Sequence, residues 1–396
     1  MTQLEHNKIS PNKVIISTGL ALFAMFFGAG NIIFPLYLGA NAGQHILANT
    51  LGFLITGVGV PMLGLIATSM FQGDYWAFFN RLGKTPAFLI ITFLIIIIGP
   101  LGAIPRVETL IFNTLEPYLY EPLKNNAWFS LIFCSTVFIL AYKETKLVDI
   151  LGLFFSPIKI ISFSTLIFVG MLYLKEPVIT NSLTCIEAFK EAFIQGYSTM
   201  DLLATFFFCT VAFKSIEQHK NNLTIANPNL TSMIVKSSLL GAALISVIYL
   251  GFMFTAYSHT ESLQGIGAEH MVKVISNVVL GKFGGLFVCI TVAFACFATA
   301  LALTEVSSNY LHKVVFKQKI KKVICLIIVT IITYCTSNLG FKTIMYYMVP
   351  VLEIVYPALI TLSIMNILYK WKNIKIVKIP VFLTAGLFLL IKIGIN

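Results

Sequence analysis

The chain has 396 residues, of which 58% are hydrophobic and only 11% are charged, and its formal net charge is +11 at pH 7. Because soluble domains carry about 25% charged residues, this composition excludes an ordinary soluble protein and indicates an all-α integral membrane protein. The positive charge needs no nucleic acid to explain it, since a lysine-rich cytoplasmic face beside anionic lipid accounts for it.

Apolar runs separated by polar breaks predict about 11 transmembrane helices. In chain order they cover residues 13–38, 46–70, 86–112, 127–142, 147–174, 193–217, 231–257, 277–311, 321–337, 341–368 and 374–394. With a cytoplasmic N-terminus, most lysines and arginines fall on the inner side, as the positive-inside rule requires. We therefore expect a multi-pass protein of a bacterial-type inner (plasma) membrane with its N-terminus in the cytoplasm.

The first predicted span carries the segment MFFGAGNIIFP at residues 25–35 in its middle. Gly28, Gly30 and Pro35 weaken a helix interior, and the amide of Asn31 finds no partner in lipid. Irregular backbone survives at this depth only where it lines a cavity or is buried in protein. We therefore predict an unwound segment, with the amides of one half-helix facing a carboxylate and the carbonyls of the other facing a cation. A glycine-lined helix contact is the alternative interpretation.

Four segments carry a family resemblance: FFGAGNIIFPLYLG in the first span, GPLGAIPR at 99–106, GYSTMDLLATFFF at 196–208 and VPVLEIVYPALI at 349–360. They resemble the branched-chain amino acid:cation symporters of bacteria. The resemblance implies a LeuT-like 5+5 inverted repeat plus one extra C-terminal helix, with substrate and ion held between the broken first and sixth helices. It also implies uptake of leucine, isoleucine or valine driven by a cation gradient. Family members usually have twelve spans, whereas this chain is predicted to have eleven.

This architecture divides the chain into five parts, and an odd number of helices per repeat gives the two repeats opposite orientations. The expected parts are a cytoplasmic N-terminal tail (1–12), a first five-helix repeat (13–174), an extracytoplasmic connector (175–192), a second, inverted five-helix repeat (193–368) and an additional C-terminal helix (369–396).

The expected substrate site combines the first and sixth spans. The predicted substrate-binding residues are Gly28, Ala29, Gly30 and Asn31 from the first span and Phe206, Phe207 and Cys209 from the sixth. The likeness of TFFFCTVAF to AMFFGAGNI places any break of the sixth span near Cys209 and Thr210, where the resemblance implies a glycine. Phe206, Phe207 and Phe208 can wall an apolar pocket, and plain helix packing is the alternative.

The cation site has two interpretations. Relatives in the wider LeuT-like superfamily hold sodium between the broken first helix and hydroxyls of the eighth, which here implies the carbonyls of Ala24 and Phe27 with the hydroxyl of Thr299. Some proton-coupled members place a lysine of the fifth helix there instead, and Lys159 lies near the middle of the predicted fifth span. Ala298 stands where the family often has a second hydroxyl. The coupling ion is therefore Na⁺ or H⁺, with sodium as the first expectation.

Other polar groups inside the spans are functional candidates because ionisable residues are costly in lipid. We expect Arg106 to pair with a nearby acid such as Glu108, and Asp201 to cap or gate the sixth span. Glu353 is either a proton carrier or half of a buried pair, with Lys159 as one candidate partner.

A secondary active transporter of branched-chain amino acids, working by cation symport with alternating access, accounts for these features together. A proton-coupled transporter of other neutral amino acids is one alternative, and a membrane channel or receptor is another. Scattered cysteines and histidines and the lack of a GxxxxGK[ST] motif argue against an enzyme or an ATP-driven pump. The expected partners are an amino-acid substrate, a coupling cation and the lipid bilayer, with no cofactor and no nucleic acid.

Overall fold

The computed structural model describes residues 9–142, 156–178, 183–224 and 228–394. Within these ranges the protein consists of helices and loops, apart from a single backbone bridge between Ile9 and Leu223. Most of the expected N-terminal tail and the first nine residues of the predicted span 147–174 lie outside the described residues, as do the last two residues of the chain.

The first half of the described chain contains the helices that correspond to the predicted first five spans. These are α1 (Pro11–Phe26), α2 (Ala29–Ala40), α3 (Ile46–Leu54), the π-helical turn η1 (Ile55–Gly59), α4 (Val60–Ser69), α5 (Tyr75–Phe79), α6 (Lys84–Ile98), α7 (Ala103–Leu115), α8 (Asn126–Tyr142) and α10 (Ser156–Leu172).

The second half begins with a helix inside the segment 175–192 that was expected to be a connector. Its helices are α11 (Cys185–Gln195), the 3₁₀ turn η6 (Gly196–Thr199), α12 (Asp201–His219), α13 (Leu230–Ser258), α14 (Thr260–Leu263), the 3₁₀ turn η8 (Ala268–His270), α15 (Met271–Tyr310), α16 (Lys322–Ser337), α17 (Phe341–Lys372) and α18 (Lys378–Gly394).

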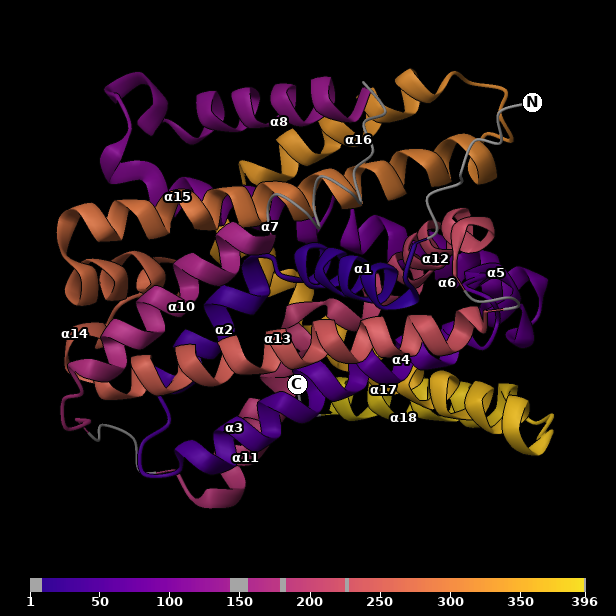
Figure 1. Cartoon of the computed structure of the whole chain (residues 1–396), viewed down its shortest axis with the longest axis horizontal. Coiled ribbons are helices and arrows are strands. Elements are labelled where there is room, and N and C mark those ends of the chain that lie inside the picture. Colours follow the sequence, from indigo (N-terminus) through magenta and orange to yellow (C-terminus); the bar gives the residue numbers. More distant parts are fainter. Residues whose placement is uncertain (1–8, 143–155, 179–182, 225–227, 395–396) are drawn as a thin grey trace.

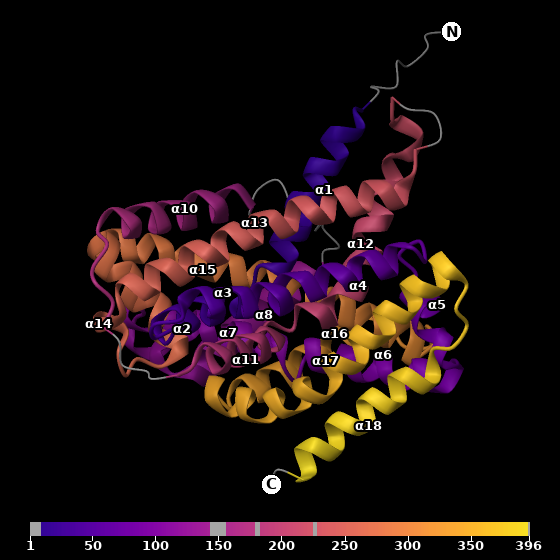
Figure 2. The ribbon, with the colours of Figure 1, turned by 90° about the horizontal axis from the view of Figure 1, so that it is seen from below.

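Length and hydropathy make many of these helices fit to cross a membrane. Among the described residues, five helical segments meet both criteria, two bent pairs meet them when each pair is taken as one span, and α8, α10 and α16 are shorter apolar helices. The all-α membrane architecture is confirmed, while the count of eleven spans stays a prediction. Helix α18 packs against α17 at one edge of the bundle (Figures 1 and 2).

The predicted break in the first span is present. Helices α1 and α2 meet at an angle of 69°, and Gly28 between them has an extended backbone with φ −118° and ψ −156°. Pro35 lies inside α2 without ending it. The chain therefore unwinds at Phe27 and Gly28, near the middle of the span.

The sixth span is also broken, but not where the sequence comparison placed the break. The segments 185–199 and 201–222 are bent by 42°, and Met200 at the bend adopts the left-handed conformation with φ 65° and ψ 10°. Cys209 and Thr210 lie within the regular turns of α12. The prediction of a break near residue 209 is therefore wrong by two and a half turns of helix.

The two broken spans lie at the centre of the fold. Helices α1 and α2 both pack along α13, α12 packs against α4, and α7 packs along α15. Helix α15 changes direction at Gly281, where φ is 70°. The core is thus built around the breaks, with α10 resting on α13 and α15.

A backbone bridge joins the start of α1 to the end of the sixth span. The amide of Ile9 donates to the carbonyl oxygen of Asn222 at 2.7 Å, and the amide of Thr224 donates to the carbonyl oxygen of Ile9 at 3.2 Å. Figure 2 shows the start of α1 beside the end of the sixth span, at the rim of the bundle.

Candidate functional site

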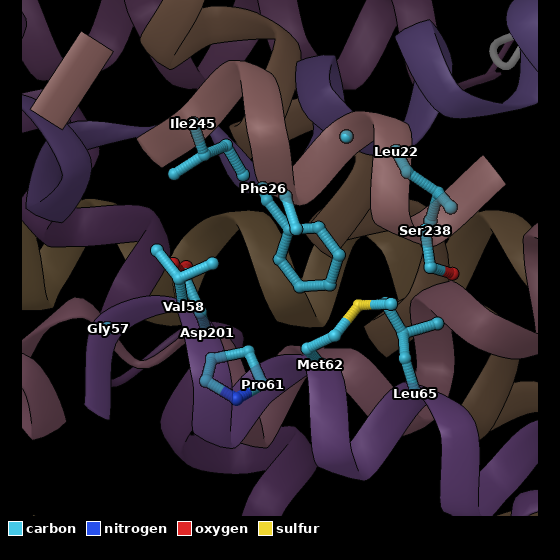
Figure 3. Close-up of a pocket in the computed structure, with 12 residues that line it drawn as sticks. Leu22, Phe26, Gly57, Val58, Pro61, Met62, Leu65, Asp201, Ser238 and Ile245 are labelled. Atoms are coloured by element: carbon cyan, nitrogen blue, oxygen red, sulfur yellow. The ribbon is translucent and has the colours of Figure 1, made fainter. Parts of the chain in front are cut away.

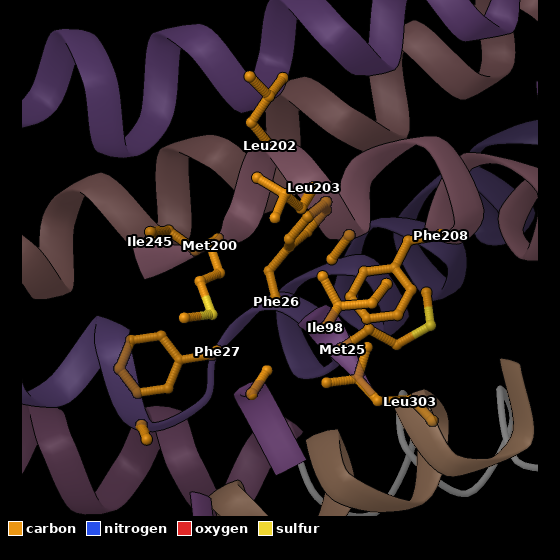
Figure 4. Close-up of a cluster of buried hydrophobic side chains, with 14 of the residues drawn as sticks. Met25, Phe26, Phe27, Ile98, Met200, Leu202, Leu203, Phe208, Ile245 and Leu303 are labelled. Atoms are coloured by element: carbon orange, nitrogen blue, oxygen red, sulfur yellow. The ribbon is translucent and has the colours of Figure 1, made fainter. Parts of the chain in front are cut away.

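A cavity lies between the two helix breaks, with about 340 Å³ free of protein atoms when the space open to its surroundings is included. It is bounded by α1, α2, α12, the end of α6, α7 and α15. Its lining residues are Met25, Phe26, Gly28, Ala29, Asn31, Ile98, Ala103, Arg106, Val107, Thr199, Met200, Asp201, Ala204, Phe208, Thr299 and Leu303. Figure 4 shows many of the apolar side chains that surround the two breaks.

Asn31 connects the two broken spans. Its Oδ1 accepts from the Gly28 amide at 3.1 Å, which satisfies one of the free N–H groups at the start of α2. Its Nδ2 donates to Asp201 Oδ2 at 2.6 Å and also to the hydroxyl of Tyr249 on α13. The Asn31 side-chain amide, which lipid could not satisfy, thus has hydrogen-bond partners at the start of α2, on α12 and on α13.

Arg106 binds the carbonyl groups on the N-terminal side of the second break. Its guanidinium donates to the carbonyl oxygen of Thr199 at 3.0 Å and to that of Ser198, and the residue is only 3% exposed. A cation is favourable beside the free carbonyls at a helix C-terminus. The expected pairing of Arg106 with Glu108 is wrong, because Glu108 instead accepts from Ser130 Oγ at 2.8 Å.

Gly30 allows the two breaks to touch. A Cβ atom at this position would lie 2.9 Å from Thr199 Cα and 3.1 Å from Arg106 Nη2. A side chain there would push the start of α2 away from the end of η6. Gly30 therefore does not line the cavity itself but sets its width.

Lys159 on α10 lies at the first break, where the sequence left two interpretations open. Its Nζ donates to the carbonyl oxygen of Ala24 at 2.9 Å and to that of Phe27 at 3.3 Å, and the residue is 1% exposed. Thr299 Oγ1 donates to the carbonyl oxygen of Met25 at 3.3 Å. The carbonyls expected to coordinate sodium thus accept from an ammonium group.

Glu353 is not the partner of Lys159. Its carboxylate pairs with Lys392 on α18, so the suggested Lys159–Glu353 pair is wrong. The ion pair instead joins α17 to the additional C-terminal helix.

The apolar side of the cavity is formed by Ile98, Val107, Ala204, Phe208 and Leu303. Ala204 and Phe208 are four residues apart on α12 and therefore share a face. The Phe208 ring also meets the ring of Phe26 edge to face, at 5.1 Å between centroids.

The other predicted residues of the sixth span point elsewhere. Phe206 packs against Phe78 and Phe79, and Phe207 packs against Tyr75. Cys209 Sγ lies 3.7 Å from the carbonyl oxygen of Leu65. Since the break is at residue 200 rather than 209, the helix phase brings Phe208 to the cavity in their place.

A second cavity, with about 330 Å³ free of protein atoms by the same measure, adjoins the first between α1, the η1–α4 segment and α13. Phe26 and Asp201 line both cavities. Figure 3 shows the Phe26 ring within this second cavity, together with Leu22, Val58, Met62 and Ile245. The two cavities therefore share the Phe26 ring and the Asp201 carboxylate as lining groups.

Sequence reasoning missed Met200 and Tyr249, and it named Phe208 as one of three phenylalanines that could wall the pocket without placing it among the predicted site residues. Met200 has no helix-breaking chemistry, and Tyr249 is one of several tyrosines in apolar surroundings. Asp201 carried a signal, because a carboxylate inside a membrane span is costly, but the sequence could not show that Asn31 is its partner.

Comparison with known proteins places this geometry in context. Residues 11–395 match the family described as branched-chain amino acid transport proteins. A relative from Staphylococcus saprophyticus, named provisionally as a branched-chain amino acid carrier protein, is 32% identical over 394 residues, covering 94% of this chain and 86% of its own. The branched-chain amino acid permease BrnQ of Bacillus subtilis is 29% identical over 374 residues, covering 91% of this chain and 82% of its own.

Solved structures support the fold. The structure of MhsT in complex with L-phenylalanine has a TM-score of 0.63 at 17% identity and covers 95% of this chain and 98% of that one. Mhp1, a nucleobase-cation-symport-1 family transporter with bromovinylhydantoin bound, has a TM-score of 0.63 at 15% identity, covering 91% and 79%. The expected LeuT-like architecture is confirmed.

Proposed function

Because the chain belongs to the family of branched-chain amino acid transport proteins, we propose that it imports leucine, isoleucine and valine by cation symport with alternating access. The observation that carries the proposal is the cavity between two broken spans, whose lining combines charged and amide side chains with hydrocarbon. A substrate held there contacts both repeats of the fold, as alternating access requires.

The polar residues that line the cavity suit the two charges of an amino acid. The amides at the start of α2 and the guanidinium of Arg106 favour a carboxylate. Asp201, which lines the same cavity, supplies a carboxylate for the ammonium group. Both charged side chains are almost fully buried, so they act in surroundings of low dielectric, where such contacts are strong.

The apolar residues that line the cavity suit an aliphatic side chain. Ile98, Val107, Ala204, Phe208 and Leu303 offer only hydrocarbon. Leucine has three more carbon atoms than alanine, so burying its side chain here favours it by about 2.4 kcal/mol at roughly 0.8 kcal/mol per methylene. The same argument gives little discrimination among leucine, isoleucine and valine.

The contacts of Lys159 favour the proton as the coupling ion. Its ammonium group donates to the carbonyls of Ala24 and Phe27, the groups a sodium ion would need, and two cations cannot share them. We propose that gain and loss of the Lys159 proton replaces gain and loss of sodium at this position. Burial disfavours the charged amine, so its protonation is coupled to how α1 and α10 pack.

Uptake of labelled leucine into proteoliposomes tests the proposal. An inward proton gradient in choline buffer should drive accumulation, and an inward sodium gradient at equal pH should add nothing. Accumulation that requires sodium would reject the lysine mechanism and keep the symporter. Absence of leucine accumulation under either gradient would reject branched-chain amino acid transport. Unlabelled isoleucine and valine should compete, whereas alanine should compete weakly.

The proposed orientation puts the N-terminus in the cytoplasm and the start of α11 outside. Cys185 at that start and Cys335 on α16 are exposed, whereas the other five cysteines are buried. A membrane-impermeant maleimide should label intact cells that carry Cys335→Ser, and adding Cys185→Ser to that variant should remove this label. Labelling of Cys185 only after permeabilisation would invert the orientation.

A further inference from the structure

Glu108 is a buried acid that the central cavity does not use. It follows Arg106 by two residues on α7, so the two side chains leave the helix on different faces. Glu108 has 0% exposure, and the ion pairs among the described residues all involve other acids. An ionised carboxylate in such surroundings is costly unless a positive charge accompanies it.

The neighbours of this carboxylate are oxygen atoms from α8 and α16. Ser130 Oγ on α8 donates to Glu108 Oε1 at 2.8 Å. Ser337 on α16 faces the same carboxylate without forming a well-aligned hydrogen bond. Glu108 Oε2 is left without a partner in the described part of the chain.

Further unused oxygens lie on the same two helices. Asn126 Nδ2 donates to the carbonyl oxygen of Ser337 at 3.2 Å, which brings the start of α8 against the end of α16. Asn126 Oδ1, Thr333 Oγ1 and Ser337 Oγ are buried and lack hydrogen-bond partners among the described residues. Asn126 is one turn from Ser130, and Thr333 is one turn from Ser337, so each pair shares a helix face.

The set of one carboxylate, one amide oxygen and three hydroxyl oxygens has the ligand chemistry of a small hard cation. A proton on Glu108 would supply one donor, whereas a hard cation gathers several carboxylate, amide and hydroxyl oxygens at once. One carboxylate balances a single positive charge. Within the described ranges no group of three histidine, cysteine or acidic side chains could hold a metal ion, so the donor set does not suit a divalent metal.

We propose that Glu108, Ser130, Asn126, Thr333 and Ser337 form a binding site for a monovalent cation such as sodium, separate from the central cavity. The ion would hold α7 against α8 and α16. Because α7 also carries Arg106, the site would fix the helix that closes the second break. The proposal does not depend on which ion drives transport.

Thermal unfolding of the purified protein, without substrate or gradient, tests the site. The melting temperature in sodium chloride should exceed that in choline chloride of equal ionic strength by roughly 2–4 °C when sodium is in large excess over its dissociation constant. Glu108→Gln keeps the size of the side chain and should abolish the difference. Equal melting temperatures of the wild-type protein in both salts would overturn the proposal.

Two further variants separate binding from folding. Ser130→Ala removes one ligand and should raise the sodium concentration for half-maximal stabilisation at least fivefold. Glu353→Gln alters the acid that pairs with Lys392 and should keep the full sodium effect. A sodium effect that survives in Glu108→Gln would place the ion elsewhere and reject this site, whatever the outcome of the leucine uptake assay.

Discussion

Lys159 Nζ lies 2.9 Å from the carbonyl oxygen of Ala24, across the gap between α10 and the end of α1. A second contact, to the carbonyl oxygen of Phe27, is 3.3 Å long. These carbonyls belong to the last turn of α1 and to its C-cap residue, where the missing helical hydrogen bonds leave them free. One lysine thus replaces the hydrogen bonds that the break in the first span removed.

Lys159→Ala should separate transport from its driving force. Without the ammonium group, no proton is exchanged at the break, so a pH gradient should no longer drive leucine accumulation, while exchange of labelled for unlabelled leucine should persist. Both activities can be measured in the same proteoliposomes. Lys190→Ala, at an exposed position on α11, is the matched control and should behave as wild type. Accumulation by Lys159→Ala under a pH gradient would contradict the prediction.

Arg106→Lys should impair transport although it keeps the charge. A lysine ammonium cannot reproduce the planar fork that reaches the carbonyls of Ser198 and Thr199 together. Loss of one charge-assisted hydrogen bond, at about 1.5–3 kcal/mol, corresponds to roughly a tenfold or greater fall in uptake rate. Arg81 also donates to two carbonyls, those of Ile374 and Lys375, so Arg81→Lys is a control that should retain uptake.

Gly30→Ala should reduce uptake without preventing insertion into the membrane. The added methyl group meets Thr199 Cα at 2.9 Å, and overpacking of this kind costs about 1–3 kcal/mol. Gly30→Leu should abolish uptake. Gly386→Ala on α18 adds the same methyl group where no atom lies within 4 Å, and it should be silent. Wild-type uptake by Gly30→Leu would show that the two breaks need not touch.

Phe208→Ala and Phe206→Ala should differ in substrate preference rather than in stability. Both rings are buried, and each truncation costs about 3–5 kcal/mol of folding free energy. Only Phe208 lines the cavity, so only Phe208→Ala should weaken competition by leucine relative to larger amino acids. Competition by a panel of unlabelled amino acids, measured against labelled leucine, reports this ranking. A change of ranking in Phe206→Ala would place that ring at the substrate.

The first break could be predicted from sequence because its cause is local. Glycines at 28 and 30, followed by Asn31, make a continuous helix exposed to lipid unfavourable at this position. The lysine that fills the gap was also visible, since Lys159 lies too deep in its helix to reach water easily. Its choice of carbonyl partners followed from the resemblance to known transporters rather than from the residue pattern.

The second break could not be predicted because its cause is tertiary. Met200 adopts a left-handed conformation that non-glycine residues rarely choose. It is held there by contacts from distant parts of the chain, including the guanidinium of Arg106 on the carbonyls before it and the amide of Asn31 on the carboxylate after it. The position of the break determines which face of α12 lines the cavity. The prediction of Phe206 and Phe207 as site residues in place of Phe208 was therefore wrong because the position of the break was wrong.

The bridge from Ile9 to Asn222 and Thr224 holds the two broken spans together at the rim of the protein. It joins the residue two positions ahead of α1 to the segment that follows α12, so α1 cannot move away from α12 until two peptide hydrogen bonds open. Water replaces such bonds at a net cost of only about 0.5–1.5 kcal/mol each, comparable to the few kcal/mol that separate the conformers of a switching protein. Under the proposed alternating-access mechanism, a fusion placed ahead of Ile9 is therefore expected to shift the balance between inward and outward conformers without altering the cavity.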